Sequence, residues 1–129
     1  MYAIGVDVGG TTVKLGCVQD GINIIYRDKR QSPRDPLQMA QAIHSMVSIA
    51  LKRFPGAAVG ISCAGSMNSQ GNVTASQLGW VSAPLGALLY EQIQRSLPME
   101  SYAMCALAAE HINVGINPSL LQYQANAFA

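Results

Sequence analysis

The first stretch that could do chemistry is DVGGTTVK, which lies between two apolar segments. Its two glycines are therefore expected at a hairpin tip, where backbone N–H groups without neighbouring side chains can face an anion. The threonine hydroxyls add donors, the lysine adds positive charge, and the aspartate offers an oxygen ligand for Mg²⁺, directly or through water. The stretch predicts a site for the β- and γ-phosphates of a nucleotide. The candidate residues are Asp7, Gly9, Gly10, Thr11, Thr12 and Lys14.

A plainer explanation of the same octapeptide is a type I′ Gly-Gly turn whose flanking polar residues are simply solvated. The stretch is not a P-loop, because it lacks the GxxxxGK[ST] pattern and leads into a strand instead of a helix. From these eight residues alone, both explanations stay open.

Composition narrows the class of protein. The chain has 129 residues, which suits one domain, and a net charge of +1 excludes a nucleic-acid binder that works by phosphate neutralisation. No basic leader precedes the first apolar run, and no apolar stretch reaches membrane-spanning length. The three cysteines have neither disulfide-framework nor zinc spacing, so we expect reduced thiols in a cytoplasmic protein.

The pattern of apolar residues predicts an α/β fold. Three short strands at hairpin spacing form an antiparallel meander, and later strands alternate with helices, which gives a mixed five-stranded sheet with crossover helices. The loop after the fourth strand should hold a small hairpin around Gly71. The predicted strands cover 2–8, 12–19, 22–29, 57–62 and 99–104, and the predicted helices cover 37–54, 85–97 and 106–113.

Charge is sparse in the second half of the chain. Between Phe54 and Ala129 there are four charged residues, namely Glu91, Arg95, Glu100 and Glu110. We expect a partner to cover this half, either further chain or a second subunit in a homodimer. Alternatively, its many Ser, Gln and Asn residues supply the soluble surface.

Two segments together carry a family resemblance. DVGGTTVK resembles the first phosphate motif of the actin/hexokinase/Hsp70 superfamily, most closely that of the ROK group of sugar kinases and repressors. VGISCAGSMNSQGNVTASQLGWVSAPL is similar to the ROK segment that borders the sugar pocket, although it departs from the family pattern at Ala64, Asn68 and Gln77. The resemblance implies a ribonuclease H-like lobe, ATP and Mg²⁺ as cofactors, and phosphorylation of a hexose or amino-hexose. The sugar-binding residues that it implies are Gly65, Asn68, Gln77, Gly79 and Ser101.

The resemblance also implies a missing catalytic base. Family kinases carry a segment like VENDANAAALAE, whose Asp takes the proton from the sugar hydroxyl; the matching segment here is MESYAMCALAAE, with Tyr102 at the Asp position. A tyrosine is largely protonated at neutral pH. Glu100 lies two residues earlier, about 7 Å away on a regular strand, and is a poor substitute. We therefore expect no catalytic residue in this chain.

Taken together, residues 1–129 are expected to form the N-terminal lobe of a ROK-type sugar kinase, with the second lobe absent and phosphoryl transfer impaired. The alternatives are a non-catalytic module that binds nucleotide or sugar, and a structural lobe that assembles with a partner chain. Nucleic acid and membrane are not expected as partners.

Several other residues have plain interpretations. His44 is expected near the polar side of the first helix with no metal role, and the Glu110–His111 pair lacks zinc-helix spacing. The basic run from Arg27 to Arg34 is typical of a solvated strand end and loop. Trp80 either packs the loop or flanks the sugar pocket. The expected core methionines are Met39, Met46, Met67, Met99 and Met104.

Overall fold

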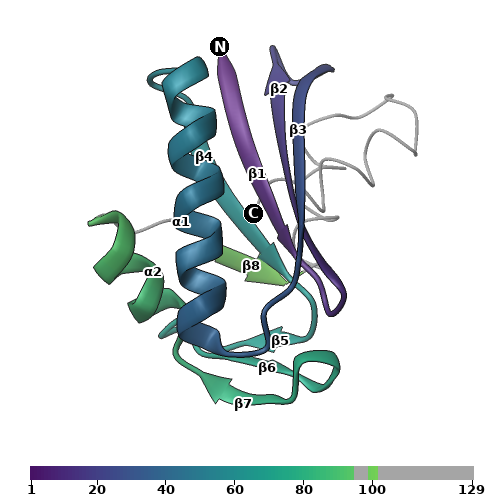
Figure 1. Cartoon of the computed structure of the whole chain (residues 1–129), viewed down its shortest axis with the longest axis vertical. Coiled ribbons are helices and arrows are strands. Elements are labelled where there is room, and N and C mark those ends of the chain that lie inside the picture. Colours follow the sequence, from purple (N-terminus) through teal and green to yellow (C-terminus); the bar gives the residue numbers. More distant parts are fainter. Residues whose placement is uncertain (95–98, 102–129) are drawn as a thin grey trace.

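The computed structural model describes residues 1–94 and 99–101. One helix, α1, lies across one face of a five-stranded sheet, and a small three-stranded sheet closes one end of the molecule (Figure 1). The large sheet has the order β3-β2-β1-β4-β8, in which β1 pairs antiparallel with β2 and parallel with β4. Its strands are β1 (Tyr2–Val8), β2 (Thr12–Gln19), β3 (Asn23–Gln31), β4 (Ala58–Cys63) and β8 (Met99–Ser101). The predicted mixed sheet is confirmed.

The first three strands form the expected meander. β2 and β3 are joined by a turn at Asp20 and Gly21, whose φ angles of 55° and 74° fit the type I′ turn that matches strand twist. Between Cys17 and Val18 the pairing of β2 with β3 shifts by one residue, which is a β-bulge.

Helix α1 (Pro36–Arg53) begins where its sequence signals predicted. Asp35 caps it by accepting a 3.0 Å hydrogen bond from the Gln38 N–H, and Pro36 occupies the first turn, where no N–H is needed. Leu37 shares the helical spacing of Ala40, Ile43 and Val47 but is 42% exposed. The side of α1 that packs on the sheet is formed by its buried residues, which are Met39, Ala40, Ile43, Met46, Val47 and Ala50.

The segment after β4 is richer in structure than predicted. The hairpin around Gly71 is present as β5 (Ser66–Met67) and β6 (Val73–Ala75), and a third strand, β7 (Trp80–Ala83), extends it after the short 3₁₀ turn η1 (Ser76–Leu78). The sequence pattern had not indicated β7.

Helix α2 (Leu85–Ile93) is shorter than the predicted 85–97, because Gln94 adopts a left-handed conformation that ends it. Its start is tied to the small sheet, where the Gly86 N–H donates to the Gly71 carbonyl at 3.0 Å. A Cβ atom on Gly86 would lie 3.1 Å from the Gly71 Cα, so the two backbones nearly touch.

A single apolar cluster joins both sheets and both helices. On β1, Ile4, Val6 and Val8 face α1 and are fully buried, while the alternate residues, including Asp7, lie on the opposite face of the sheet. Met39 and Met46 are core residues as predicted, and Met67 and Met99 pack against the cluster. The predicted third helix, Met104 and His111 lie outside the described residues.

Candidate phosphate and sugar site

The β1–β2 hairpin tip presents two backbone donors. The Gly9 N–H closes the tip by donating to the Thr12 carbonyl at 3.1 Å. The Gly10 and Thr11 N–H groups donate to no described residue. Among the glycines of the described chain, those with positive φ do not include Gly9 or Gly10, so the tip is not the type I′ turn that the plainer explanation required. The tip can therefore offer main-chain amides to an anion.

The segment between β3 and α1 braces this tip. The Ser32 hydroxyl donates to the Gly9 carbonyl at 2.7 Å, and the Ser32 N–H donates to the Thr11 carbonyl at 2.9 Å. These two bonds use carbonyls on either side of the two available amides. The tip is thus held by a separate segment of chain as well as by its own turn.

Asp7 and Lys14 lie beside each other just behind the tip. They are direct Cα partners in the β1–β2 ladder, so their side chains project from the same face. Across the sheet the same row continues to Ser62 on β4 and Lys29 on β3. Asp7 is half-buried and Lys14 is exposed. A carboxylate and an ammonium group therefore share one face of the sheet at the base of the hairpin.

The candidate sugar-side segment meets the tip through Gln77. A Cβ atom placed on Gly10 would lie 2.6 Å from the Gln77 Cβ, so this glycine leaves the room that Gln77 occupies. The Arg34 Nη1 donates to the Gln77 carbonyl at 2.7 Å, and the Trp80 Nε1 donates to the Arg34 carbonyl at 2.6 Å. The segment that braces the tip thus also holds the loop that carries Gln77.

The other predicted sugar residues have local structural roles. The Asn68 Oδ1 accepts hydrogen bonds from the N–H groups of Gln70 and Asn72, both at 3.0 Å, and so closes the β5–β6 turn. Gly65 has a φ of 87°, and Gly79 ends η1 with a φ of 71°. The structure brings Gln77 next to the tip, and the Ala64 N–H, beside Gly65, donates to the Val8 carbonyl at 3.0 Å where the tip begins.

Ser101 ends strand β8 and pairs with Cys63, while Glu100 pairs with Ser62 in the row that includes Asp7. Tyr102 lies outside the described residues.

Trp80 and His44 differ in burial. Trp80 is 4% exposed and bonded to the chain of residue 34, which fits a packing role. His44 is half-buried on α1.

Within residues 1–94 and 99–101, no three His, Cys, Asp or Glu side chains gather as a metal site, and neither helix is long and apolar enough to cross a membrane.

Sequence reasoning missed Ser32 and Arg34. Arg34 was expected in a solvated basic run and Ser32 was not singled out, but Ser32 reaches back to the tip and Arg34 reaches forward to the 3₁₀ turn of the small sheet. Ser32 and Arg34 precede the helix and belong to no repeating apolar pattern, so the sequence did not indicate a role for them. Nothing in the local sequence shows which distant carbonyls they bind.

The profile of the ROK family matches residues 3–118 of this chain. The chain belongs to the ROK family. Glucokinases of Streptomyces coelicolor and Streptomyces lividans are each 32% identical over 110 residues, which cover 84% of this chain. Those residues are 35% of each glucokinase, so this ROK chain spans about a third of the curated relatives' length.

Solved ROK structures share the fold. The ROK hexokinase of Thermus thermophilus superposes with a TM-score of 0.72 at 24% identity, covering 86% of this chain and 38% of the hexokinase. A ROK family glucokinase from Streptomyces griseus, solved with glucose and AMPPNP, has a TM-score of 0.68 at 28% identity over 86% of this chain and 36% of its own. The expected actin-like fold class is confirmed.

Proposed function

We propose that this chain is the N-terminal, phosphate-binding lobe of a ROK sugar kinase, and that its hairpin tip binds the β- and γ-phosphates of ATP. The observation behind the proposal is the pair of amides at Gly10 and Thr11, which donate to no described residue at a tip braced by Ser32. Backbone amides that converge at a tight turn favour bound anions. The Streptomyces griseus relative was solved with AMPPNP, an ATP analogue, which supports a nucleotide ligand.

The charged residues beside the tip fit a magnesium–nucleotide complex. Mg²⁺ in nucleotide sites is held by one or two carboxylates together with phosphate oxygens, and Asp7 is the carboxylate to which we assign this role. Lys14, its ladder partner, would offset the remaining phosphate charge. When bound, the ion would neutralise phosphate oxygens and so favour phosphoryl transfer.

A sugar is the second ligand in this proposal. Gln77 contacts the tip, so a hexose held near it would lie close to the terminal phosphate. Glucose is the sugar that we favour, because the curated relatives are glucokinases and one solved relative holds glucose. Gly65, Asn68, Gly79 and Ser101 are proposed to shape or line the same pocket.

Phosphoryl transfer itself is proposed to be impaired. Tyr102 occupies the position of the family's catalytic Asp, and a phenol with a pKa near 10 is rarely ionised at neutral pH. One lobe also cannot enclose the reactants from water. We propose that a second lobe or a partner subunit, in a cytoplasmic homodimer, covers the weakly charged second half of the chain.

Nucleotide binding can be tested with the chain's single tryptophan, Trp80, which is buried and linked through Arg34 to Gln77. We expect Mg-AMPPNP to change Trp80 fluorescence in the wild type and to bind Asp7→Asn at least about tenfold more weakly, because a charged ligand to the ion is lost. Asp20→Asn, in the exposed β2–β3 turn, is the matched control. Equal binding by the two variants would contradict the proposal.

The impaired-base proposal needs a transfer assay on the protein as its gene encodes it. We expect little glucose phosphorylation from ATP, and a gain of turnover in Tyr102→Asp. Nucleotide and glucose binding without turnover in either form would favour the non-catalytic binding module. Full turnover in the unaltered protein would show that Tyr102 does not replace a required base.

A further inference from the structure

Arg34 is an exposed cation that the structure holds firmly in place. Its side chain is tied by the 2.7 Å hydrogen bond from Nη1 to the Gln77 carbonyl. Its backbone is tied by the 2.6 Å hydrogen bond that its carbonyl accepts from the buried Trp80 Nε1. Exposed arginines usually move among many rotamers, so a residue fixed at both its backbone and its side chain is already ordered for binding.

A closed ring of contacts joins Arg34 to the hairpin tip. Ser32, two residues earlier, bonds to the two tip carbonyls, and two residues of chain span at most about 7 Å. On the other side, Arg34 bonds to Gln77, whose Cβ would lie 2.6 Å from a Cβ atom on Gly10. The arginine therefore lies beside the tip, between the segment that braces it and the loop that contacts it.

Most of the hydrogen-bonding capacity of this guanidinium is still available. A guanidinium group offers several N–H donors and no acceptor. Within residues 1–94 and 99–101, it donates to the Gln77 carbonyl alone and forms no ion pair. Its acidic neighbour Asp35 uses its Oδ2 to cap α1 at Gln38. The remaining donors and the positive charge can therefore serve an anion.

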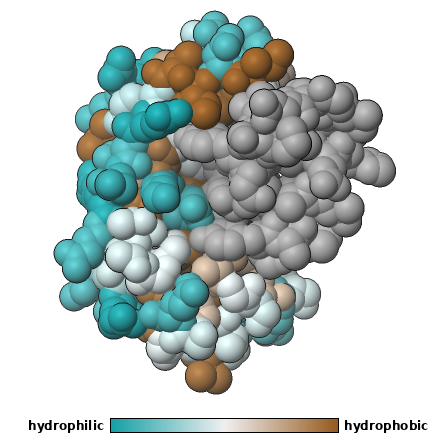
Figure 2. Space-filling model, turned by 90° about the vertical axis from the view of Figure 1, so that its right-hand side faces the viewer, coloured by the Kyte–Doolittle hydropathy of each residue, from teal (hydrophilic) through white to brown (hydrophobic). Residues whose placement is uncertain are grey.

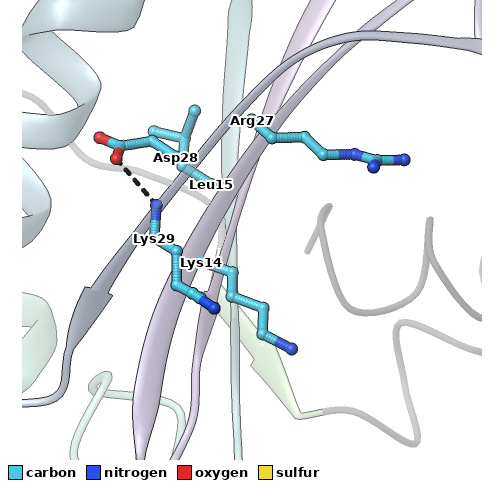
Figure 3. A pocket seen from close by; sticks show the side chains of 5 residues that line it. All are labelled: Lys14, Leu15, Arg27, Asp28 and Lys29. Carbon is cyan, nitrogen blue, oxygen red and sulfur yellow. Dashed lines mark hydrogen bonds between the residues drawn. The ribbon is translucent and has the colours of Figure 1, made fainter.

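The lysines nearest the tip lie on a different side of it. Hydrophilic residues gather along the described part of the side of the molecule seen in Figure 2. On the large sheet, Lys14 and Lys29 are ladder partners and line a pocket of about 310 Å³ (Figure 3). They share the sheet face of Asp7 at the base of the hairpin, whereas Arg34 bonds to the loop that carries Gln77. Arg34 thus supplies positive charge on the Gln77 side of the tip.

The plainest explanation of Arg34 is a structural clamp on the 3₁₀ turn η1. A clamp accounts for the bond to the Gln77 carbonyl, but a single neutral N–H donor would satisfy that carbonyl equally well. It does not account for a fixed positive charge beside Gly10 and Thr11, whose N–H groups donate to no described residue. Open amides and an available guanidinium on one side of a tip favour a bound phosphate.

We propose that the Arg34 guanidinium binds the terminal phosphate of the nucleotide, and that it makes this site favour a nucleoside triphosphate over a diphosphate. The proposal rests on the proposed function for the nucleotide and for the place of the sugar. In that function the sugar lies near Gln77, so the phosphate closest to Arg34 is the terminal one. The planar fork of an arginine matches two oxygens of one phosphate, and a diphosphate has no group at that position.

The test is calorimetric titration of the chain with Mg-AMPPNP and with Mg-ADP. We expect the wild type to bind Mg-AMPPNP more tightly than Mg-ADP. Arg34→Gln should weaken Mg-AMPPNP binding at least about tenfold and Mg-ADP binding less than about twofold, because only the terminal phosphate loses a charged partner. Arg34→Lys keeps the charge without the fork and should lose less. Lys52→Gln, exposed in the last turn of α1, is the matched control and should keep both affinities.

The ratio of the two affinities separates binding from a clamp, because a lost clamp would weaken both ligands alike. An unchanged ratio in Arg34→Gln would overturn the proposal, whether both affinities fall together or neither moves. Circular dichroism establishes that each variant is folded, and Arg34→Lys carries the same test if Arg34→Gln is not.

Failure of this inference is distinguishable from failure of the proposed function. If the wild type binds neither nucleotide, both proposals are overturned. If Asp7→Asn weakens Mg-AMPPNP binding but the Arg34 variants keep the wild-type ratio, the proposed function stands and the role of Arg34 is overturned.

Discussion

Gly65 has a left-handed backbone between β4 and β5, with a φ of 87°. A Cβ atom there would clash with the backbone oxygen of Thr74, so both conformation and space demand glycine. Gly79 has a similar φ of 71°, but its Cβ would meet nothing within 4 Å. A substitution at Gly79 therefore introduces backbone strain alone, whereas one at Gly65 introduces backbone strain and a steric clash.

We expect Gly79→Ala to lower the free energy of unfolding by about 1–2 kcal/mol, the cost of a left-handed alanine. Gly65→Ala should lower it by about 3 kcal/mol or more, because the small sheet must also shift. Urea denaturation of the two variants measures the difference. Equal losses would mean that the backbone near Thr74 yields easily.

Cys17 gives a prediction about pH. Burial raises the pKa of its thiol, with a smaller opposing effect from a backbone hydrogen bond with Ala3. The unfolded chain therefore loses this proton at a lower pH than the folded protein does. Its contribution to stability is complete below about pH 8.5 and declines as pH rises through the folded pKa.

We expect the free energy of unfolding of the wild type to fall more steeply above about pH 8.5 than that of Cys17→Ala. Denaturant titrations at a series of pH values measure the two slopes. Parallel slopes would show that the thiol titrates alike in both states.

At the scale of elements, the Ser32–Arg34 segment connects the hairpin tip with the small sheet. Ser32→Ala removes the hydroxyl bond to the Gly9 carbonyl and should cost about 1 kcal/mol of stability. Because the tip loses a brace, Mg-AMPPNP affinity should fall as well. Ser69→Ala, in the exposed β5–β6 turn, should leave both quantities unchanged. A loss of stability with unchanged affinity would mean that Ser32 does not position the tip.

Elements with local signals were predictable from the sequence. The three-strand meander, the small hairpin around Gly71 and the strand at β1 followed from local patterns of apolar and turn residues. These features depend on neighbours in the chain, so they can be deduced from a short window.

Features that depend on distant contacts were not predictable. The exposure of Leu37 depends on which side of α1 meets the sheet, and the helical spacing alone does not give that side. The contact of Gly10 with Gln77 joins residues far apart in sequence, and the bracing role of Ser32 depends on a carbonyl 23 residues away. The candidate phosphate residues were found because they are contiguous, whereas Arg27 and Lys29 become neighbours of Lys14 only through sheet pairing.

For the whole molecule, the shared apolar cluster predicts cooperative unfolding. Core residues of the large sheet, the small sheet and both helices belong to one cluster, which includes Trp80. We expect the urea transition followed by Trp80 fluorescence to coincide with the one followed by far-UV circular dichroism. Separate midpoints would show that the small sheet unfolds on its own.

The near contact of Gly71 and Gly86 limits which sequences this domain can accept. If every position were randomised and surviving clones were sequenced, these two codons should change little, as should that of Gly65, because any side chain at Gly71 or Gly86 pushes the α2 start away from the β5–β6 turn. Gly21 and Gly56 face open space and should accept asparagine, which tolerates a left-handed backbone. In such a library, random substitutions would therefore be tolerated best in the turns that contain Gly21 and Gly56.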